Sequence, residues 1–184
     1  MDTEGVIMSN LLEGLVQIYT GDGKGKTTAA FGLALRAVGH GFRVYIIQFM
    51  KGNDGSGELE GVKRLSPECQ IEHFGGPGWV HKGERLKENI EEAYKAFLRA
   101  QEIILSGNWD IVILDEILNA LWFELIPESE VLELLSKKPS HMELILTGRN
   151  ASQPLIERAD LVTEMVKRKH PCEKGIMSRQ GIEF

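Results

Sequence analysis

The chain has 184 residues, which is the ordinary size of one globular domain. Its 42% hydrophobic and 26% charged residues, with 20 glycines and 6 prolines, exclude a disordered, collagen-like or coiled-coil protein. Its 21 Lys and Arg against 27 Asp and Glu give a net charge of −6, so nucleic acid is not expected as the main partner.

Short β-branched runs alternate with longer helical patterns, which is typical of a parallel sheet with helices on both faces. The first predicted helix is apolar on almost every side, so we expect it to be buried. Strands are predicted at residues 15–19, 43–49, 70–74, 110–115, 142–147 and 160–165, helices at 27–38, 84–105 and 127–138, and glycine-rich loops at 51–61 and 75–83.

This pattern predicts one α/β domain over residues 1–184, with a mostly parallel six-stranded sheet and a tail of uncertain order at 1–14. Cys69 and Cys172 have neither disulfide nor zinc spacing, which favours a reducing compartment. The start of the chain lacks the features of a secretory signal, and no stretch approaches the ~20 apolar residues of a membrane helix. We therefore expect a cytoplasmic protein that does not enter the membrane.

The strongest motif is GDGKGKTT, which directly follows a predicted strand and begins the next predicted helix. Glycines let backbone amides face phosphate oxygens, the helix N-terminus adds partial positive charge, Lys26 adds a full charge, and the Thr27 hydroxyl is a magnesium ligand. The motif predicts a Walker A-like nucleotide site. Its residues are Gly21, Asp22, Gly23, Lys24, Gly25, Lys26, Thr27 and Thr28.

The spacing of this motif is atypical, because Thr20 stands where the first glycine of a phosphate loop is expected. A chance cluster of Gly and Lys is the alternative, and the strand-loop-helix context favours the phosphate site. For Lys24, phosphate contact and a solvated loop charge have equal weight.

A second motif, DIVILDE, is an apolar strand that ends in Asp115 and Glu116. Acids at this end of a strand reach the crevice where α/β sheets bind ligands, and magnesium prefers oxygen ligands. Either acid is a candidate magnesium ligand opposite Thr27. The alternative is that one of them caps the following helix. The residues alone lead to a magnesium nucleotide enzyme or switch.

The order and wording of the motifs add a resemblance over residues 15–184. The motifs, in chain order, are GDGKGKTTAAFGLALRAVGHG, QFMKG, DIVILDEI, LTGR, ADLVTEM and the closing KHPCEKGIMSRQGIEF. In these motifs the chain closely resembles the ATP:corrinoid adenosyltransferases of the CobA/CobO/BtuR type.

That resemblance implies a RecA-like P-loop NTPase fold, usually a homodimer, that serves adenosylcobalamin biosynthesis or corrinoid salvage. It implies a transferase that uses ATP and Mg²⁺, with Mn²⁺ as an alternative, and a reductase or flavodoxin-like electron donor as partner. In this reaction cobalt(I) of a reduced corrinoid attacks C5′ of ATP, and triphosphate leaves.

By matching motif positions, the resemblance implies catalytic roles for Lys26, Thr27 and Glu116. Lys26 binds triphosphate, while Thr27 and Glu116 hold magnesium with support from Asp115. Arg36 and Arg149 are candidate nucleotide contacts, with a surface charge and a structural ion pair as equally weighted alternatives.

For the corrinoid, the resemblance points to the second glycine-rich loop. Trp79 fits the tryptophan of the Gly-Phe-Thr-Trp type sequence of the family, whereas Pro77 occupies the place of its aromatic partner. Phe74 is the candidate substitute, and His81 is the histidine nearest to Trp79. A packing role for Trp79 is the alternative.

A different class of function fits the two nucleotide motifs equally well. A P-loop ATPase or nucleotide-dependent switch that acts on a protein partner needs the same phosphate loop and acidic strand end. Dependence on a corrinoid separates the two hypotheses.

Overall fold

The computed structural model describes residues 11–52, 56–76 and 87–183. Its six strands form one parallel sheet in the order β3-β2-β4-β5-β1-β6. The strands are β1 (Val16–Thr20), β2 (Val44–Gln48), β3 (Cys69–His73), β4 (Ile111–Asp115), β5 (Glu143–Thr147) and β6 (Leu161–Glu164). The helices are α1 (Lys26–Val38), α2 (Gly57–Lys63), α3 (Lys87–Ser106), α4 (Ile117–Trp122), α5 (Glu128–Lys137), α6 (Gln153–Arg158) and the 3₁₀ helix η1 (Pro171–Lys174).

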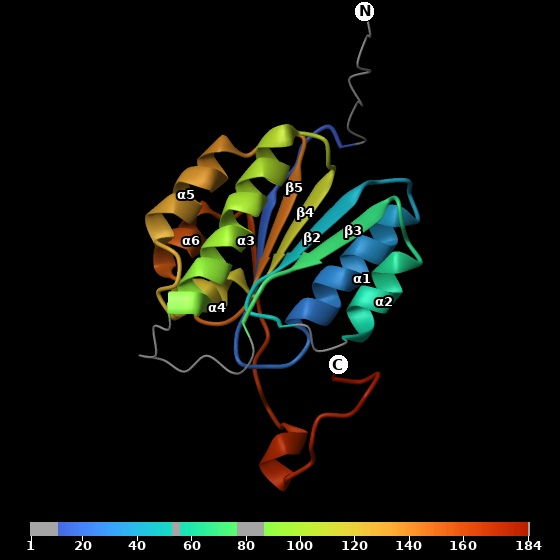
Figure 1. The fold of residues 1–184 in the computed structure, drawn as a ribbon, viewed down its shortest axis with the longest axis vertical. Helices are drawn as coiled ribbons and strands as arrows, with labels where there is room; N and C mark the ends of the chain where they lie inside the picture. Colours follow the sequence, from blue (N-terminus) through green and yellow to red (C-terminus); the bar gives the residue numbers. More distant parts are fainter. Residues whose placement is uncertain (1–10, 53–55, 77–86, 184) are drawn as a thin grey trace, which may run out of the picture.

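Helices cover both faces of this sheet (Figure 1). α1 and α2 lie on one face, and α3, α4, α5 and α6 lie on the other. This arrangement confirms the predicted α/β class, the six strands and the parallel sheet. β5 separates β4 from β1, so the acidic strand and the strand before the phosphate loop are not direct neighbours.

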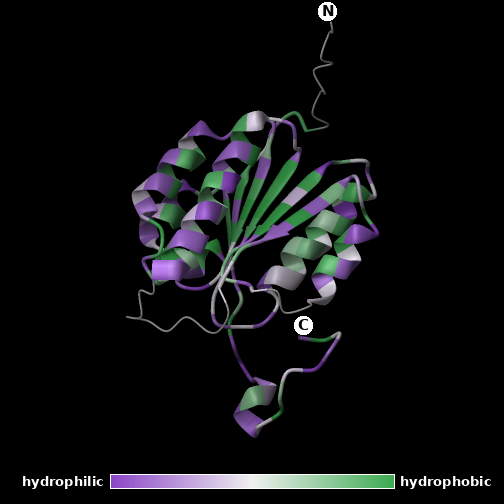
Figure 2. Ribbon diagram, in the orientation of Figure 1, coloured by the Kyte–Doolittle hydropathy of each residue, from purple (hydrophilic) through white to green (hydrophobic). Residues whose placement is uncertain are grey.

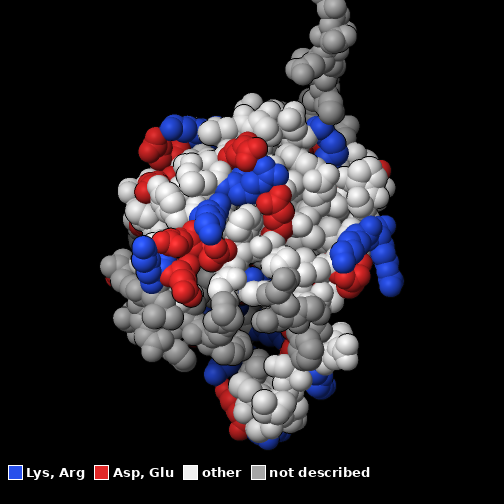
Figure 3. Space-filling model, viewed as in Figure 1, with Lys and Arg blue, Asp and Glu red and all other residues white. Residues whose placement is uncertain are grey.

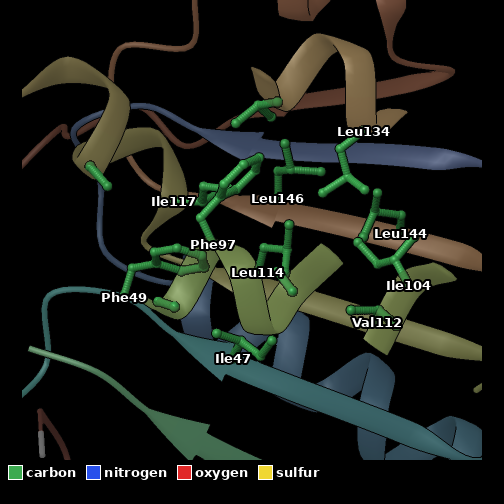
Figure 4. Packing of buried hydrophobic residues seen from close by; sticks show 14 of the residues in the cluster. Ile47, Phe49, Phe97, Ile104, Val112, Leu114, Ile117, Leu134, Leu144 and Leu146 are labelled. Atoms are coloured by element: carbon green, nitrogen blue, oxygen red, sulfur yellow. The ribbon is translucent and has the colours of Figure 1, made fainter. Parts of the chain in front are cut away.

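The core consists of two apolar layers, one on each face of the sheet. All five residues of β2 and all five of β4 are buried, because these central strands are covered on both faces. Figure 2 shows mostly apolar residues along the central strands and a mixture of polar and apolar residues along α3 and α5. In the larger layer, Phe97 of α3 packs among residues such as Phe49 and Leu114 (Figure 4).

The helices differ from the sequence prediction in several ways. α4, α6 and η1 lie outside the predicted helix ranges, and two further differences concern α2 and α1. α2 begins within the segment 51–61 that was predicted to be a loop, with Glu58 and Glu60 in its first turn and Val62 buried. That segment is too short and too rich in glycine to show a helical period. α1 is not buried on all sides as predicted, since Leu35 is 59% exposed. Its small residues Ala30, Ala34 and Ala37 form the buried face.

The chain leaves the sheet after β6, which is an edge strand with all four residues exposed. Residues 166–183 then lie beyond the carboxyl ends of the strands, on the same side as the loop that joins β1 to α1 (Figure 1). Among the described helices, none combines the length and the apolar character that a membrane crossing requires.

The two cysteines have opposite environments, which predicts a difference in reactivity. Cys69 is buried, and burial raises the pKa of its thiol to about 11, whereas Cys172 is exposed and its Sγ lies 2.8 Å from Nδ1 of His170. Because thiolate is the reactive form, iodoacetamide at about pH 8 should modify Cys172 and leave Cys69 intact. Mass spectrometry should find one modified cysteine in the native protein and two after denaturation. Equal modification of both cysteines in the native protein would contradict the burial of Cys69.

Candidate nucleotide-binding site

The predicted nucleotide motifs meet at the carboxyl ends of three adjacent strands. β5 pairs with β4 on one side and with β1 on the other, so the residues that follow these strands lie side by side. Ligands of open α/β sheets bind in the crevice at this edge. The phosphate loop, defined here as residues 21–28, follows β1, while the acids Asp115 and Glu116 lie at the end of β4.

The glycines of the phosphate loop are required by a close approach of two backbones. The amide of Gly23 donates a hydrogen bond to the carbonyl of Met165, at 2.6 Å, where the chain leaves β6. A Cβ would lie 2.5 Å from that carbonyl oxygen at Gly21 and 2.6 Å at Gly23, and Gly21 also has φ of 100°. Side chains at either position would clash with Met165. Thr20, at the atypical position, ends β1, and its carbonyl accepts from the Met165 amide.

Lys26 lies inside the loop at the start of α1. Its side chain is buried, and Nζ donates to the carbonyls of Gly21 and Gly23, each at 2.7 Å. Burial lowers the pKa of this ammonium, while the neighbouring Glu116 carboxylate acts in the opposite direction. The carbonyls of the loop itself therefore hold the Lys26 ammonium group in position.

Asp115 is fully buried and is surrounded by donors from other elements. Thr27 Oγ1 donates to its Oδ1 at 2.9 Å, and Thr147 Oγ1 donates to the same atom at 2.7 Å. Gln48 Nε2 donates to Oδ2 at 3.0 Å, and Nζ of Lys51 lies 3.6 Å from that oxygen. These contacts leave the Asp115 carboxylate occupied by protein groups and fix the orientation of Thr27.

Glu116 is held in an unusual backbone conformation beside this network. Its φ is 65°, in the left-handed region, and its amide donates to Thr147 Oγ1 at 2.9 Å. It occupies the N-cap position of α4, but its side chain makes no cap hydrogen bond, so the capping alternative does not describe it. Burial and the nearby Asp115 raise the pKa of the Glu116 carboxyl, against the opposing effect of Lys51.

Asn119 joins Glu116 to the turn that follows β5. Its Nδ2 donates to the carboxylate of Glu116, and its Oδ1 accepts from the amide of Arg149 at 2.8 Å. Gly148 has φ of 138°, and a Cβ there would lie 2.8 Å from the Cβ of Leu118. This close packing fixes the backbone before Arg149, whose charge lies near enough to Lys26 and Glu116 to affect the pKa of both.

Other predicted nucleotide residues lie apart from this center. Asp22 and Thr28 are exposed on the phosphate loop, and Lys24 contacts the C-terminal end of the chain. Arg36 lies in the last turn of α1, ten residues and about 15 Å along the helix axis from Lys26. The structure therefore does not bring Arg36 to the phosphate loop, in contrast to Arg149, because α1 runs away from that edge of the sheet.

The three predicted corrinoid residues are described only in part. Phe74 follows β3 and is half-buried against the larger core layer, with its amide bonded to the carbonyl of Gln48 at 2.9 Å. Trp79 and His81 lie outside the described residues, as does Pro77.

Four contributors to the site were not identified as site residues from the sequence: Gln48, Lys51, Asn119 and Thr147. The motif QFMKG was a signal for the first two, because it spans the end of the strand predicted at 43–49. Thr147 precedes the TGR glycine, and its role depends on pairing between β4 and β5, which the local sequence does not show.

Lys26 is the first residue to test. Lys26→Ala should weaken triphosphate binding by about 3 kcal/mol, or roughly 100-fold in Kd, because charge-assisted hydrogen bonds to phosphate are lost. Isothermal titration with ATP measures this loss. Lys137→Ala, which removes an exposed lysine paired with Glu133 on α5, is the matched control and should bind normally. Normal binding by both variants would contradict a phosphate site in this loop.

Asn119 gives a second prediction. Asn119→Ala removes one donor from Glu116 and one acceptor from Arg149, so it should lower the free energy of unfolding by about 1–3 kcal/mol and weaken ATP binding as well. Urea denaturation and ATP titration measure the two effects. Asn108→Ala, in the exposed turn before β4, is the control. Loss of stability with unaltered ATP binding would mean that Asn119 serves packing alone.

Comparison with known proteins gives the family of the chain. The family model described as ATP:corrinoid adenosyltransferase BtuR/CobO/CobP matches residues 12–184. A corrinoid adenosyltransferase from Sinorhizobium sp is 41% identical over 174 residues, which are 94% of this chain and 81% of that protein. The Pseudomonas aeruginosa and Escherichia coli K12 proteins of the same name are 35% and 32% identical, each over 93% of this chain and over 84% and 86% of their own lengths. The chain therefore belongs to the ATP:corrinoid adenosyltransferase family.

Proposed function

We propose that the site at the carboxyl ends of β1, β4 and β5 transfers the 5′-deoxyadenosyl group of ATP to the cobalt(I) of a corrinoid and releases triphosphate. Family membership carries the reaction class: the chain is a corrinoid adenosyltransferase. The observation that carries the location is the adjacent pair of Lys26, which is buried, and Thr27, whose hydroxyl donates to Asp115.

Triphosphate binds in the phosphate loop in this proposal. The two loop carbonyls that hold Nζ of Lys26 show that this charge already lies at the inner side of the loop. Backbone amides at the start of α1 supply further donors, since the first turn of a helix has free N–H groups. Arg149 adds positive charge from the turn after β5.

The oxygen donors present also fit a magnesium ion, which the family implies. Thr27 and Glu116 are the residues that we propose to hold it, because Asp115 is already occupied by donors from Thr27, Thr147 and Gln48. Asp115 then supports the metal site by orienting the Thr27 hydroxyl. When bound, the ion supplies positive charge that offsets the charge of the triphosphate.

The proposed reaction requires no general acid or base from the protein. Cobalt(I) donates an electron pair to C5′, a Co–C bond forms, and the C5′–O bond breaks with its electron pair on the departing triphosphate. No proton has to be removed from the nucleophile. Lys26, Arg149 and the loop amides act by positioning ATP and by stabilising the charge that grows on the leaving group.

For the corrinoid side, we propose contacts from Trp79 and His81, and from Phe74, which directly follows β3. The support is the resemblance of the segment 75–83 to the corrinoid loop of the family. Phe74 also follows β3 and is hydrogen-bonded to β2, whose end provides Gln48 to the nucleotide site.

We propose a homodimer, a reductase or flavodoxin-like donor that supplies the electron for cobalt(I), and a cytoplasmic location where ATP and reductant are available. We also propose that the chain works as one domain, since strands from residue 16 to residue 164 enter one sheet and the family model spans residues 12–184.

An anoxic assay with magnesium ATP and chemically reduced cobalamin tests the reaction. We expect a light-sensitive adenosylated corrinoid and inorganic triphosphate in equal amounts, because the whole triphosphate is the leaving group. Absorbance spectra and anion-exchange chromatography measure the two products. Release of ADP and phosphate at the rate of turnover, independent of the corrinoid, would contradict the proposal and favour the P-loop ATPase or switch.

A further inference from the structure

The C-terminal end of the chain returns to the phosphate loop. Residues 166–183 lie below the carboxyl ends of the strands in Figure 1, and their last part contacts Lys24. Nζ of Lys24 donates to the carbonyl of Ile182 at 2.8 Å and to Oε1 of Glu183 at 3.0 Å. Ile182 and Glu183, which are 158 and 159 positions from Lys24 in the sequence, therefore contact the phosphate loop directly.

The C-terminal partner of Lys24 is a closed turn. The amides of Ile182 and Glu183 donate to the carbonyl of Arg179 at 3.1 and 2.9 Å. In return, the backbone amide of Arg179 donates to Glu183 Oε2 at 2.8 Å, and its Nη2 donates to Oε1 at 3.0 Å. We call residues 179–183 the C-terminal turn. Its hydrogen bonds hold the Glu183 carboxylate in place toward Lys24.

The charge of this carboxylate is stable across the physiological range. The hydrogen bonds from Arg179, followed by the one from Lys24, lower the pKa of Glu183 to about 2. The ammonium group of Lys24 thus donates to an ionised carboxylate and to a carbonyl oxygen. Both are oxygen acceptors, as the oxygens of a phosphate group are. Around the protruding segment, Figure 3 shows positive and negative side chains close together.

The two lysines of the loop differ in the partners that they have. Lys26 is buried and bonded within the loop itself, whereas the side chain of Lys24 is 44% exposed and its partners come from the other end of the chain. An exposed ion pair contributes little to stability, so exchange of its partner requires little free energy. A triphosphate in the loop would add several negative charges next to Glu183, which favours separation of the turn from the loop.

We propose that the C-terminal turn competes with triphosphate for Lys24, so that Arg179 and Glu183 are positioning residues that set the affinity for ATP. This inference rests on the proposed function, because it takes the phosphate loop as the triphosphate site. When triphosphate binds, Lys24 moves from Glu183 to a phosphate oxygen, and the C-terminal turn leaves the loop. The bound ligand then favours the open position of the turn because Lys24 contacts it only in that state.

Hydrogen exchange of the full-length protein tests the competition, with inorganic tripolyphosphate as the probe. In the unsubstituted protein, saturating tripolyphosphate should increase exchange at the amides of residues 179–183 by about threefold or more, since the loop no longer holds the turn. Glu183→Gln should show fast exchange without the probe and a Kd for tripolyphosphate that is lower by about two- to fivefold, the range expected from loss of one exposed ion pair.

Glu173→Gln is the matched control, because it breaks the ion pair between Lys167 and Glu173 on the same segment, at 2.9 Å, without touching the loop. Its exchange at residues 179–183 and its Kd should equal those of the unsubstituted protein. Binding of tripolyphosphate with unchanged or slower exchange of the turn, or weaker binding by Glu183→Gln, would overturn the competition alone. Failure of tripolyphosphate to bind the unsubstituted protein would overturn the phosphate site, and with it the proposed function.

Discussion

A carboxylate removed from water costs several kcal/mol unless donors surround it, and Asp115 satisfies this requirement only when the rest of the site is in place. Its donors come from α1, from β5 and from β2, through Thr27, Thr147 and Gln48. Each donor lies at or next to an end of its element, so a shift of any of these elements along the sheet removes a bond. The buried charge therefore ties the register of the strands to the position of the phosphate loop.

The same requirement gives the two neighbouring acids different roles. Asp115 is directed into the sheet and is fully occupied by protein donors, whereas Glu116 is turned out of the strand by its left-handed backbone. A positive φ in a residue other than glycine costs free energy, and the bond from its amide to Thr147 helps to offset that cost. In our proposal, one acid shapes the site and the other faces the ligand.

The sequence predicted the sheet well because burial on both faces makes the central strands continuous apolar runs, as in β2 and β4. It predicted the location of the phosphate loop for a similar local reason, since strand, glycines, lysine and helix follow one another directly. The partners of Asp115 were harder to find. Thr147 and Gln48 are close to Asp115 only because β5 and β2 flank β4. The order of strands in a sheet cannot be deduced from the sequence of any one strand. Arg36 was a candidate contact for the nucleotide sugar or base, and the structure places it at the far end of α1 from the phosphate loop.

The end of β6 accounts for two glycines of the phosphate loop, Gly21 and Gly23. This strand is exposed on both faces and buries little apolar area, so its contribution to the core is small. Its exit at Met165, however, lies against the phosphate loop, and the amide of Gly23 bonds to the Met165 carbonyl. That contact leaves no space for a Cβ at Gly21 or Gly23. The edge of the sheet thus determines the path of the loop, and the segment that follows the same strand provides the partner of Lys24. A change in the pairing of β6 with β1 would therefore move the phosphate loop, where we propose that triphosphate binds, with little loss of buried apolar area.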